Sequence, residues 1–175
     1  GWDKQREITF SKQKEMGVIG AAAELTPRHD SIPAWDAMDP KLKPVLEREM
    51  EVYAAFMEHT DHHVGRIINA LKDMEILDDT LIYVIVGDNG ASAEGTLQGA
   101  FNEMANFNGM ADLETPEFLL SKLDEFGGEG SYGHYAVGWA WAMDTPYQWT
   151  KQVASHWGGT RNGTIVHWPK GIQDK

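Results

Sequence analysis

The segment Leu81–Gly90 constrains the fold most strongly, because a run of six apolar residues stops abruptly at polar ones. The run Leu81–Val86 is rich in β-branched residues and predicts a short strand buried on both faces, as in parallel sheets. Asp88 and Asn89 follow it directly. Because ligands of open α/β sheets bind outside the carboxyl ends of strands, we expect these two side chains at a ligand site. The alternative is an ordinary turn, since Asp-Asn-Gly is also common turn chemistry.

Asp88 and Asn89 together favour a hard divalent cation. Carboxylate and amide oxygens suit Ca²⁺ or Mg²⁺ better than zinc. The 175 residues include no cysteine, which excludes disulfides, thiolate metal sites and a cysteine nucleophile from this chain. We therefore expect Ca²⁺ or Mg²⁺.

Composition excludes several classes of partner. The net charge of -12 argues against a general nucleic-acid binder, which needs a basic surface. No apolar run reaches the length that crosses a bilayer, so we expect no membrane partner. With 42% hydrophobic residues, a chain of this length can form a core of about one domain. Both a periplasmic and a cytoplasmic location are compatible with the sequence.

Hydrophobic periodicity predicts the remaining architecture. Apolar residues at spacings of three and four indicate a long amphipathic helix over residues 46–74. This helix leads into the apolar strand, and the pair forms half of an α/β unit. The other expected elements are a helix over residues 3–16, an extended loop over 18–46 that Trp35 anchors to the core, a short helix over 116–126 and a strand over 163–168.

A long aromatic and glycine-rich loop region is expected over residues 126–149. One interpretation is that its aromatic side chains line the entrance for a substrate. The alternative is that they pack into the core, because aromatic residues bury a large contact area. The residues in question are Tyr132, His134, Trp139, Trp141, Tyr147 and Trp149.

The segment Lys151–Arg161 is a second candidate for chemistry. It carries Lys151, His156 and an arginine around the double glycine Gly158–Gly159. Near a divalent cation, a lysine and an imidazole can bind an oxyanion, the lysine as a point charge and the histidine as donor or general acid. The glycines permit close backbone approach. The alternative is a loop in which His156 caps a neighbour and Arg161 pairs with a surface acid.

In their order along the chain, these elements resemble the sulfatase family, in particular bacterial arylsulfatases of the large type. The resemblance extends over nearly all 175 residues. It implies part of an alkaline-phosphatase-like α/β fold, in which helices flank a mostly parallel sheet. The matching segments are Met50–Arg66, Thr80–Gly90, Ser92–Gly95 and Lys151 ahead of His156–Asn162.

The resemblance also implies roles for particular residues. Sulfatases hold one divalent cation, usually Ca²⁺, between an early aspartate pair and a later Asp-Asn pair, which Asp88 and Asn89 match. Lys151 corresponds to a lysine that contacts the sulfate ester, and His156 is a further candidate in the same pocket. The family's nucleophile is a formylglycine made from the first residue of a Cys/Ser-x-Pro-x-Arg motif. Ser31–Trp35 comes closest to that motif but lacks the arginine.

We therefore expect residues 1–175 to be the later part of a single sulfatase catalytic domain. The formylglycine would lie outside this chain, and the remainder of the same domain would be its partner. The expected reaction is hydrolysis of a small-molecule sulfate monoester, with this chain alone inactive. The alternatives are a phosphate or phosphonate monoester hydrolase of the same superfamily, a non-catalytic module that binds Ca²⁺, and a piece without independent function.

Overall fold

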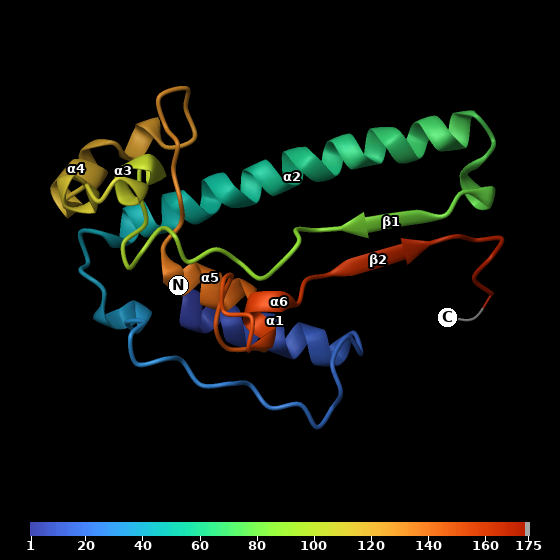
Figure 1. Cartoon of the computed structure of the whole chain (residues 1–175), viewed down its shortest axis with the longest axis horizontal. Coiled ribbons are helices and arrows are strands. Elements are labelled where there is room, and N and C mark those ends of the chain that lie inside the picture. Colours follow the sequence, from blue (N-terminus) through green and yellow to red (C-terminus); the bar gives the residue numbers. More distant parts are fainter. Residues whose placement is uncertain (174–175) are drawn as a thin grey trace. The chain divides into compact units, whose positions relative to one another are not determined.

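The computed structural model describes residues 1–173, which divide into two compact units. The first unit comprises residues 1–53 and 89–161, and the second comprises residues 54–88 and 162 onward. The helix α2 (Lys43–Asp73) runs through both. The other helices of the first unit are α1 (Trp2–Glu15), α3 (Glu103–Phe107), α4 (Pro116–Ser121), α5 (Val137–Met143) and α6 (Trp157–Thr160), with 3₁₀ turns at Trp35–Ala37, Ala111–Leu113 and Leu123–Glu125 (Figure 1).

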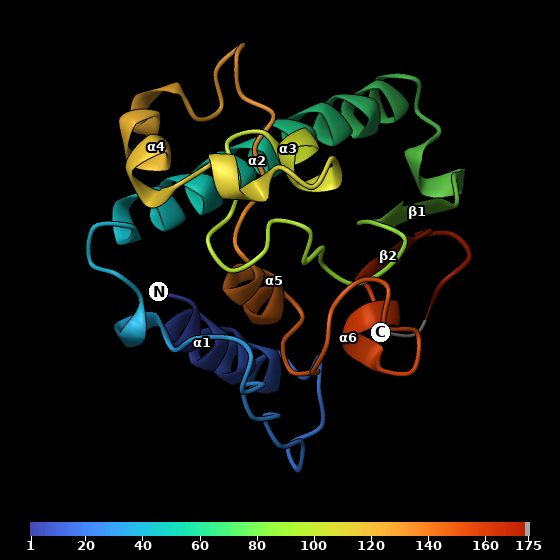
Figure 2. The same ribbon diagram turned by 60° about the vertical axis from the view of Figure 1, so that its left-hand side comes forward.

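Three tryptophans form the centre of the first unit, where α1 lies beside α5 (Figure 2). The buried ring of Trp2 packs edge-on against the rings of Trp35 and Trp139. The distances between ring centroids are 4.8 Å and 5.8 Å. A Cβ on Gly138 would overlap the indole of Trp2, so only glycine permits this approach of the two helices. The Trp139 indole donates a hydrogen bond to the Leu46 carbonyl (2.8 Å), which brings in the start of α2. The prediction that Trp35 anchors the proline-containing loop is confirmed.

Arg6 ties α1 to the segment after α5. Its guanidinium is 1% exposed and donates to the carbonyl oxygens of Trp141 (2.7 Å) and Tyr147 (2.7 Å) and to the Thr26 hydroxyl (2.6 Å). It also lies over the Trp141 ring, 4.4 Å from the ring centroid. Burial lowers the pKa of Arg6 to about 10, so the side chain stays charged at neutral pH. The buried Arg6 guanidinium therefore fixes the segment between Trp141 and Tyr147, which lies a few residues before Lys151 in the sequence.

The aromatic segment 126–149 differs from the sequence-based expectation. Residues 137–143 form the helix α5 rather than a loop. Trp139 and Trp141 are only 7% and 5% exposed, so the prediction that they line an entrance is wrong, and their alternative, core packing, is correct. Successive helical residues are rotated by about 100°, so the two indoles point to different sides of α5. Both are buried because Trp2 packs against Trp139 and Arg6 packs against Trp141. Tyr132 and Trp149, in contrast, are exposed.

The second unit contains a two-stranded sheet. Strand β1 (Ile82–Ile85) pairs with β2 (Thr164–His167), with Ile82 opposite His167 (Figure 1). Within the described residues this sheet is small and antiparallel, whereas the sequence predicted part of a mostly parallel one. The strand itself is where it was expected, but Tyr83 and Ile85 are exposed instead of buried. The apolar run specified a strand, but the direction of its partner depends on Thr164–His167, a distant segment of the chain.

The helical predictions are confirmed to within a few residues. The expected helices over 3–16 and 46–74 correspond to α1 and α2. The short helix expected over 116–126 is divided into α4 and a 3₁₀ turn. No helix in the described part of the chain has the length and apolarity needed to cross a bilayer.

Candidate functional site

A backbone contact holds the loop after β1 against the double glycine of α6. The Gly90 N–H donates to the Gly159 carbonyl oxygen (3.2 Å). A Cβ on Gly90 would overlap the Gly158 carbonyl, and a Cβ on Gly158 would overlap the Trp149 carbonyl. Glycine is required at both positions, because a backbone oxygen cannot turn aside as a flexible side chain can. The close approach predicted for the double glycine is confirmed, and its partner is the loop that begins at Asn89.

Lys151 lies directly beside this loop. Its backbone N–H donates to the Ala91 carbonyl (2.9 Å), and its ammonium donates to Glu94 Oε2 (3.1 Å). The two side chains are partly exposed, at 36% for the lysine and 23% for the glutamate. The structure therefore places the lysine that was expected to bind an oxyanion at a site open to solvent.

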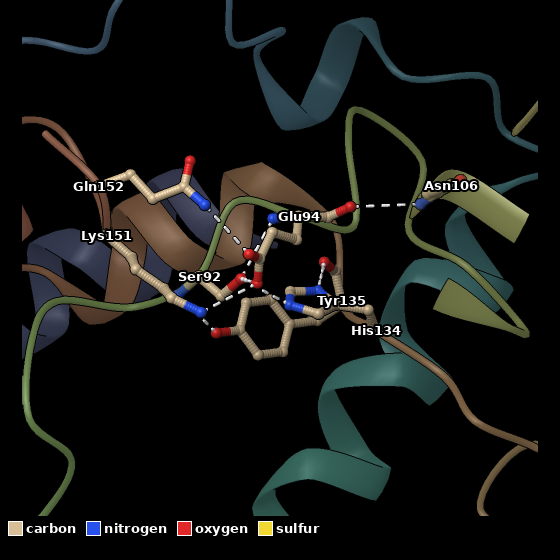
Figure 3. Close-up of polar contacts among 7 residues, drawn as sticks. All are labelled: Ser92, Glu94, Asn106, His134, Tyr135, Lys151 and Gln152. Atoms are coloured by element: carbon tan, nitrogen blue, oxygen red, sulfur yellow. Dashed lines mark hydrogen bonds and ion pairs between the residues drawn. The ribbon is translucent and has the colours of Figure 1, made fainter. Parts of the chain in front are cut away.

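Glu94 is the centre of a polar network (Figure 3). Its Oε2 accepts a hydrogen bond from Ser92 Oγ (2.6 Å) as well as from Lys151, and its Oε1 accepts one from Gln152 (3.1 Å). Its backbone carbonyl accepts from the Asn106 amide (3.2 Å). The bond from Ser92 is the main cause that lowers the pKa of Glu94, and the bond and charge of Lys151 add to it. The carboxylate is therefore ionised at neutral pH.

Three further residues fix the loop that carries this network. The Ser92 N–H donates to the hydroxyl of Tyr135 (3.1 Å), and the Ser92 hydroxyl meets His134 Nε2 (2.9 Å). The Ala91 N–H donates to Asp144 Oδ1 (2.8 Å). Burial raises the pKa of Asp144 to about 7, although the Ala91 amide acts in the opposite direction. The loop between Asn89 and Gly95 is thus held by side chains from the segment 134–144.

The polar side chains border a small pocket. It has a volume of about 180 Å³ and is lined by Ala93, Glu94, Lys151 and Gln152. A water molecule occupies roughly 30 Å³ of liquid, so the pocket has room for a few waters or for a small anionic group. Its wall presents one cation, one anion and one amide, which can bind a polar ligand.

His156 and Arg161 have other partners. The His156 ring contacts the Ser155 hydroxyl (2.9 Å) and lies beside Trp149, with 5.6 Å between ring centroids. The Arg161 guanidinium lies 3.8 Å from the centroid of the Trp157 ring. Neither side chain is among the hydrogen-bond partners of the site lysine in the described part of the chain. The structure therefore brings Lys151 together with Glu94, and His156 together with aromatic rings.

Asp88 and Asn89 fall at the boundary between the two units, with Asp88 in the second and Asn89 in the first. Their donor chemistry fits an oxygen-seeking cation. Across residues 1–173, no group of three or more His, Cys, Asp or Glu side chains could hold a metal ion. Because Ca²⁺ takes six to eight oxygen ligands, this pair can supply only part of a set.

The sequence analysis gave no role to Ser92, Glu94 and Asp144, and it considered His134 only for an aromatic entrance or for core packing. A signal existed for the first two, because Ser92 and Glu94 flank a single alanine in a loop that leaves the end of a strand. Asp144 lies 53 residues beyond its partner Ala91, and His134 lies 42 residues beyond Ser92. Contacts over such separations leave no local pattern in the sequence.

Comparison with known proteins shows the family of this chain. The sulfatase family model matches residues 3–175. An uncharacterized sulfatase of Schizosaccharomyces pombe (strain 972 / ATCC 24843) is 29% identical over 170 residues, which are 97% of this chain and 29% of that protein. An arylsulfatase of Klebsiella aerogenes is 27% identical over 163 residues, 91% of this chain and 32% of that protein. The chain spans less than a third of the length of these curated relatives, and it belongs to the sulfatase family.

Proposed function

We propose that this chain forms the later part of a catalytic domain that hydrolyses sulfate monoesters of the arylsulfatase type. The observation that supports this most directly is the position of Lys151, whose ammonium lies at a pocket beside the loop that follows Asp88 and Asn89. A lysine in that place suits the oxyanion of a sulfate ester, because it contributes a compact positive charge. The family match supports a sulfuric ester hydrolase in general.

The proposed cofactor is Ca²⁺, with Mg²⁺ as the second choice. Asp88 and Asn89 would hold it through a carboxylate and an amide oxygen, and the other ligands would come from the remainder of the same domain. When bound, such a cation offsets negative charge on the ester oxygens. The proposed nucleophile is a formylglycine that also lies outside these 175 residues.

The residues of this chain bind and orient the ester. Lys151 would hold a sulfate oxygen, Glu94 would hold Lys151 at the pocket, and Gln152 would hold Glu94. A preorganised cation at the position where charge develops stabilises a transition state without reorganising solvent. His156 stays a further candidate for the same anion, since it lies on the adjoining loop next to the exposed Trp149.

The remainder of the domain is the proposed partner of the second unit. Four side chains of the two-stranded sheet are exposed although they are large and apolar: Tyr83, Ile85, Ile165 and Val166. Additional strands and helices would bury them, and a sheet with such open surfaces is otherwise prone to association. Because the proposed nucleophile and the other proposed cation ligands are not among these 175 residues, the chain alone is expected to be inactive.

An assay of the complete protein with an aryl sulfate tests this function. With Ca²⁺ present we expect turnover, and Lys151→Ala should lower kcat/KM about 100-fold, as removal of one charge-stabilising donor does in other enzymes. Lys170→Ala is the matched control, because that lysine is 61% exposed and pairs with Asp79 in the second unit. Faster turnover of the matching aryl phosphate would favour the phosphate monoester alternative. Calcium binding without turnover of either ester would favour the non-catalytic module.

A further inference from the structure

A series of three hydrogen-bond contacts runs from the Tyr135 carbonyl through His134 and Ser92 to Glu94. With a neutral imidazole, only two hydrogen atoms are available for these three contacts. His134 Nδ1 lies 2.8 Å from the Tyr135 carbonyl, which can only accept, so Nδ1 carries a hydrogen atom. His134 Nε2 lies 2.9 Å from Ser92 Oγ, which lies 2.6 Å from Glu94 Oε2. With a neutral imidazole, only the single hydroxyl hydrogen remains for these last two contacts.

The protonation of His134 therefore decides where the Ser92 hydroxyl points. When the ring is neutral, Nε2 is an acceptor and competes with the carboxylate for that hydrogen atom. When the ring is protonated, Nε2 donates to Ser92 Oγ, and the hydroxyl is free to donate to Glu94. In that state the hydroxyl uses all of its capacity, because it also accepts from the Glu94 N–H (3.2 Å).

Several charged and titratable groups lie near this series of hydrogen bonds. Lys151 reaches Glu94 from the segment before α6, and its charge and that of His134 both act on the carboxylate. The Tyr135 hydroxyl accepts a hydrogen bond from the Ser92 N–H. Tyr53 of α2 packs against the Tyr135 ring, with 4.9 Å between ring centroids. Asp144 holds the neighbouring Ala91 amide. Histidine as a residue type changes its charge between pH 5 and 8, and burial raises the pKa of Asp144 to about 7, so the variants below must separate the two groups.

We propose that Glu94 is a positioning residue for Lys151, and that the Ser92 hydroxyl couples this ion pair to the protonation of His134. With His134 protonated, Glu94 shares its charge with the hydroxyl and holds Lys151 less tightly. With His134 neutral, the imidazole competes with Glu94 for the Ser92 hydrogen atom, and the carboxylate relies more on Lys151 and Gln152. The availability of the Lys151 ammonium for an anion then falls as His134 loses its proton. Only the catalytic meaning of this coupling rests on the proposed role of Lys151 in ester binding.

Competitive labelling of lysines tests the coupling without any turnover. The purified protein is treated with a trace of acetic anhydride between about pH 5.5 and pH 7.5, which brackets histidine titration. Mass spectrometry then gives the labelling of Lys151 relative to the exposed Lys12 of α1, which corrects for the free-amine fraction. Because partly exposed ion pairs are weak, we expect this ratio to fall about threefold over the range.

Three variants separate the parts of the inference. Glu94→Gln should raise the ratio at every pH, because the neutral amide does not hold the ammonium. Ser92→Ala and His134→Gln should each remove the pH dependence, since the first lacks the hydroxyl and the second does not titrate. His62→Gln on the exposed face of α2 is the matched control and should keep the wild-type profile. Circular dichroism checks that every variant is folded.

The outcomes that contradict the inference are distinct. An unchanged ratio in Glu94→Gln would show that Glu94 does not position Lys151. A wild-type pH profile in folded Ser92→Ala or His134→Gln would show that the hydroxyl transmits nothing. If the labelling behaves as expected while the complete protein fails to turn over an aryl sulfate, the coupling stands and the proposed function is wrong.

Discussion

Replacement of Arg6 by methionine should destabilise the first unit strongly. Arg6 is 1% exposed and donates at 2.7 Å to the carbonyls of Trp141 and Tyr147. Hydrogen bonds from a charged group contribute about 1.5–3 kcal/mol each, so the loss of these two alone, without the bond to Thr26, costs roughly 3–6 kcal/mol. Methionine fills most of the space and avoids burial of a charge, which offsets part of this loss. We expect the free energy of unfolding to fall by about 3 kcal/mol.

Urea denaturation followed by tryptophan fluorescence and circular dichroism measures this change. Arg48→Met is the matched control, because Arg48 is 42% exposed and its contact with Glu51 is a surface ion pair at 3.5 Å. That variant should differ from wild type by less than about 0.5 kcal/mol. Arg6→Lys keeps the charge but not the planar fork of donors, so its loss should be intermediate. A change below about 1 kcal/mol in Arg6→Met would refute the argument that this cation holds α1 to the segment after α5.

Three further predictions concern close backbone approach and one buried acid. Gly138→Ala should lower stability by about 1–3 kcal/mol, because its Cβ overlaps the Trp2 indole; an unchanged melting temperature would mean that α1 and α5 separate without cost. Gly90→Ala should displace the loop from Gly158, so the complete protein should lose most of its aryl sulfate turnover while its melting temperature changes little. Unchanged turnover would contradict this. Burial raises the pKa of Asp144 from 3.8 to about 7, so the folded state favours the neutral acid. That stabilisation is complete below about pH 3.8 and is lost as the pH rises through about 7. In denaturation series between those values, Asp144→Asn should lose part of this slope, and an identical slope in the variant would refute the assignment.

Local patterns predicted the elements of this chain well. The spacing of apolar residues located α2, because that spacing follows directly from 3.6 residues per turn. The run Leu81–Val86 located β1, since β-branched residues favour extended backbone. The prediction failed where packing decides, as for Trp139 and Trp141, which look like residues of a loop but lie in the core.

The candidate site was predictable only in part. Lys151 was identified from its position ahead of the double glycine, and the structure places it at a pocket beside the loop after Asn89. Glu94 lies in Ser92–Gly95, one of the segments that resemble the sulfatase family, but the sequence assigned it no role. His134 was considered only for an aromatic entrance or for core packing. Its contact with Ser92 joins residues 42 positions apart and has no local pattern.

The sequence by itself determined which residues form helix or strand and which family the chain resembles, because both depend on the kind and spacing of neighbouring residues. Only the tertiary structure decided that β1 pairs antiparallel to β2, that the indoles of α5 turn inward, and that Glu94 holds Lys151. These features depend on which distant segments meet. Their free energy comes from shape fit and from proton donors brought within about 3 Å of acceptors, neither of which a local pattern contains.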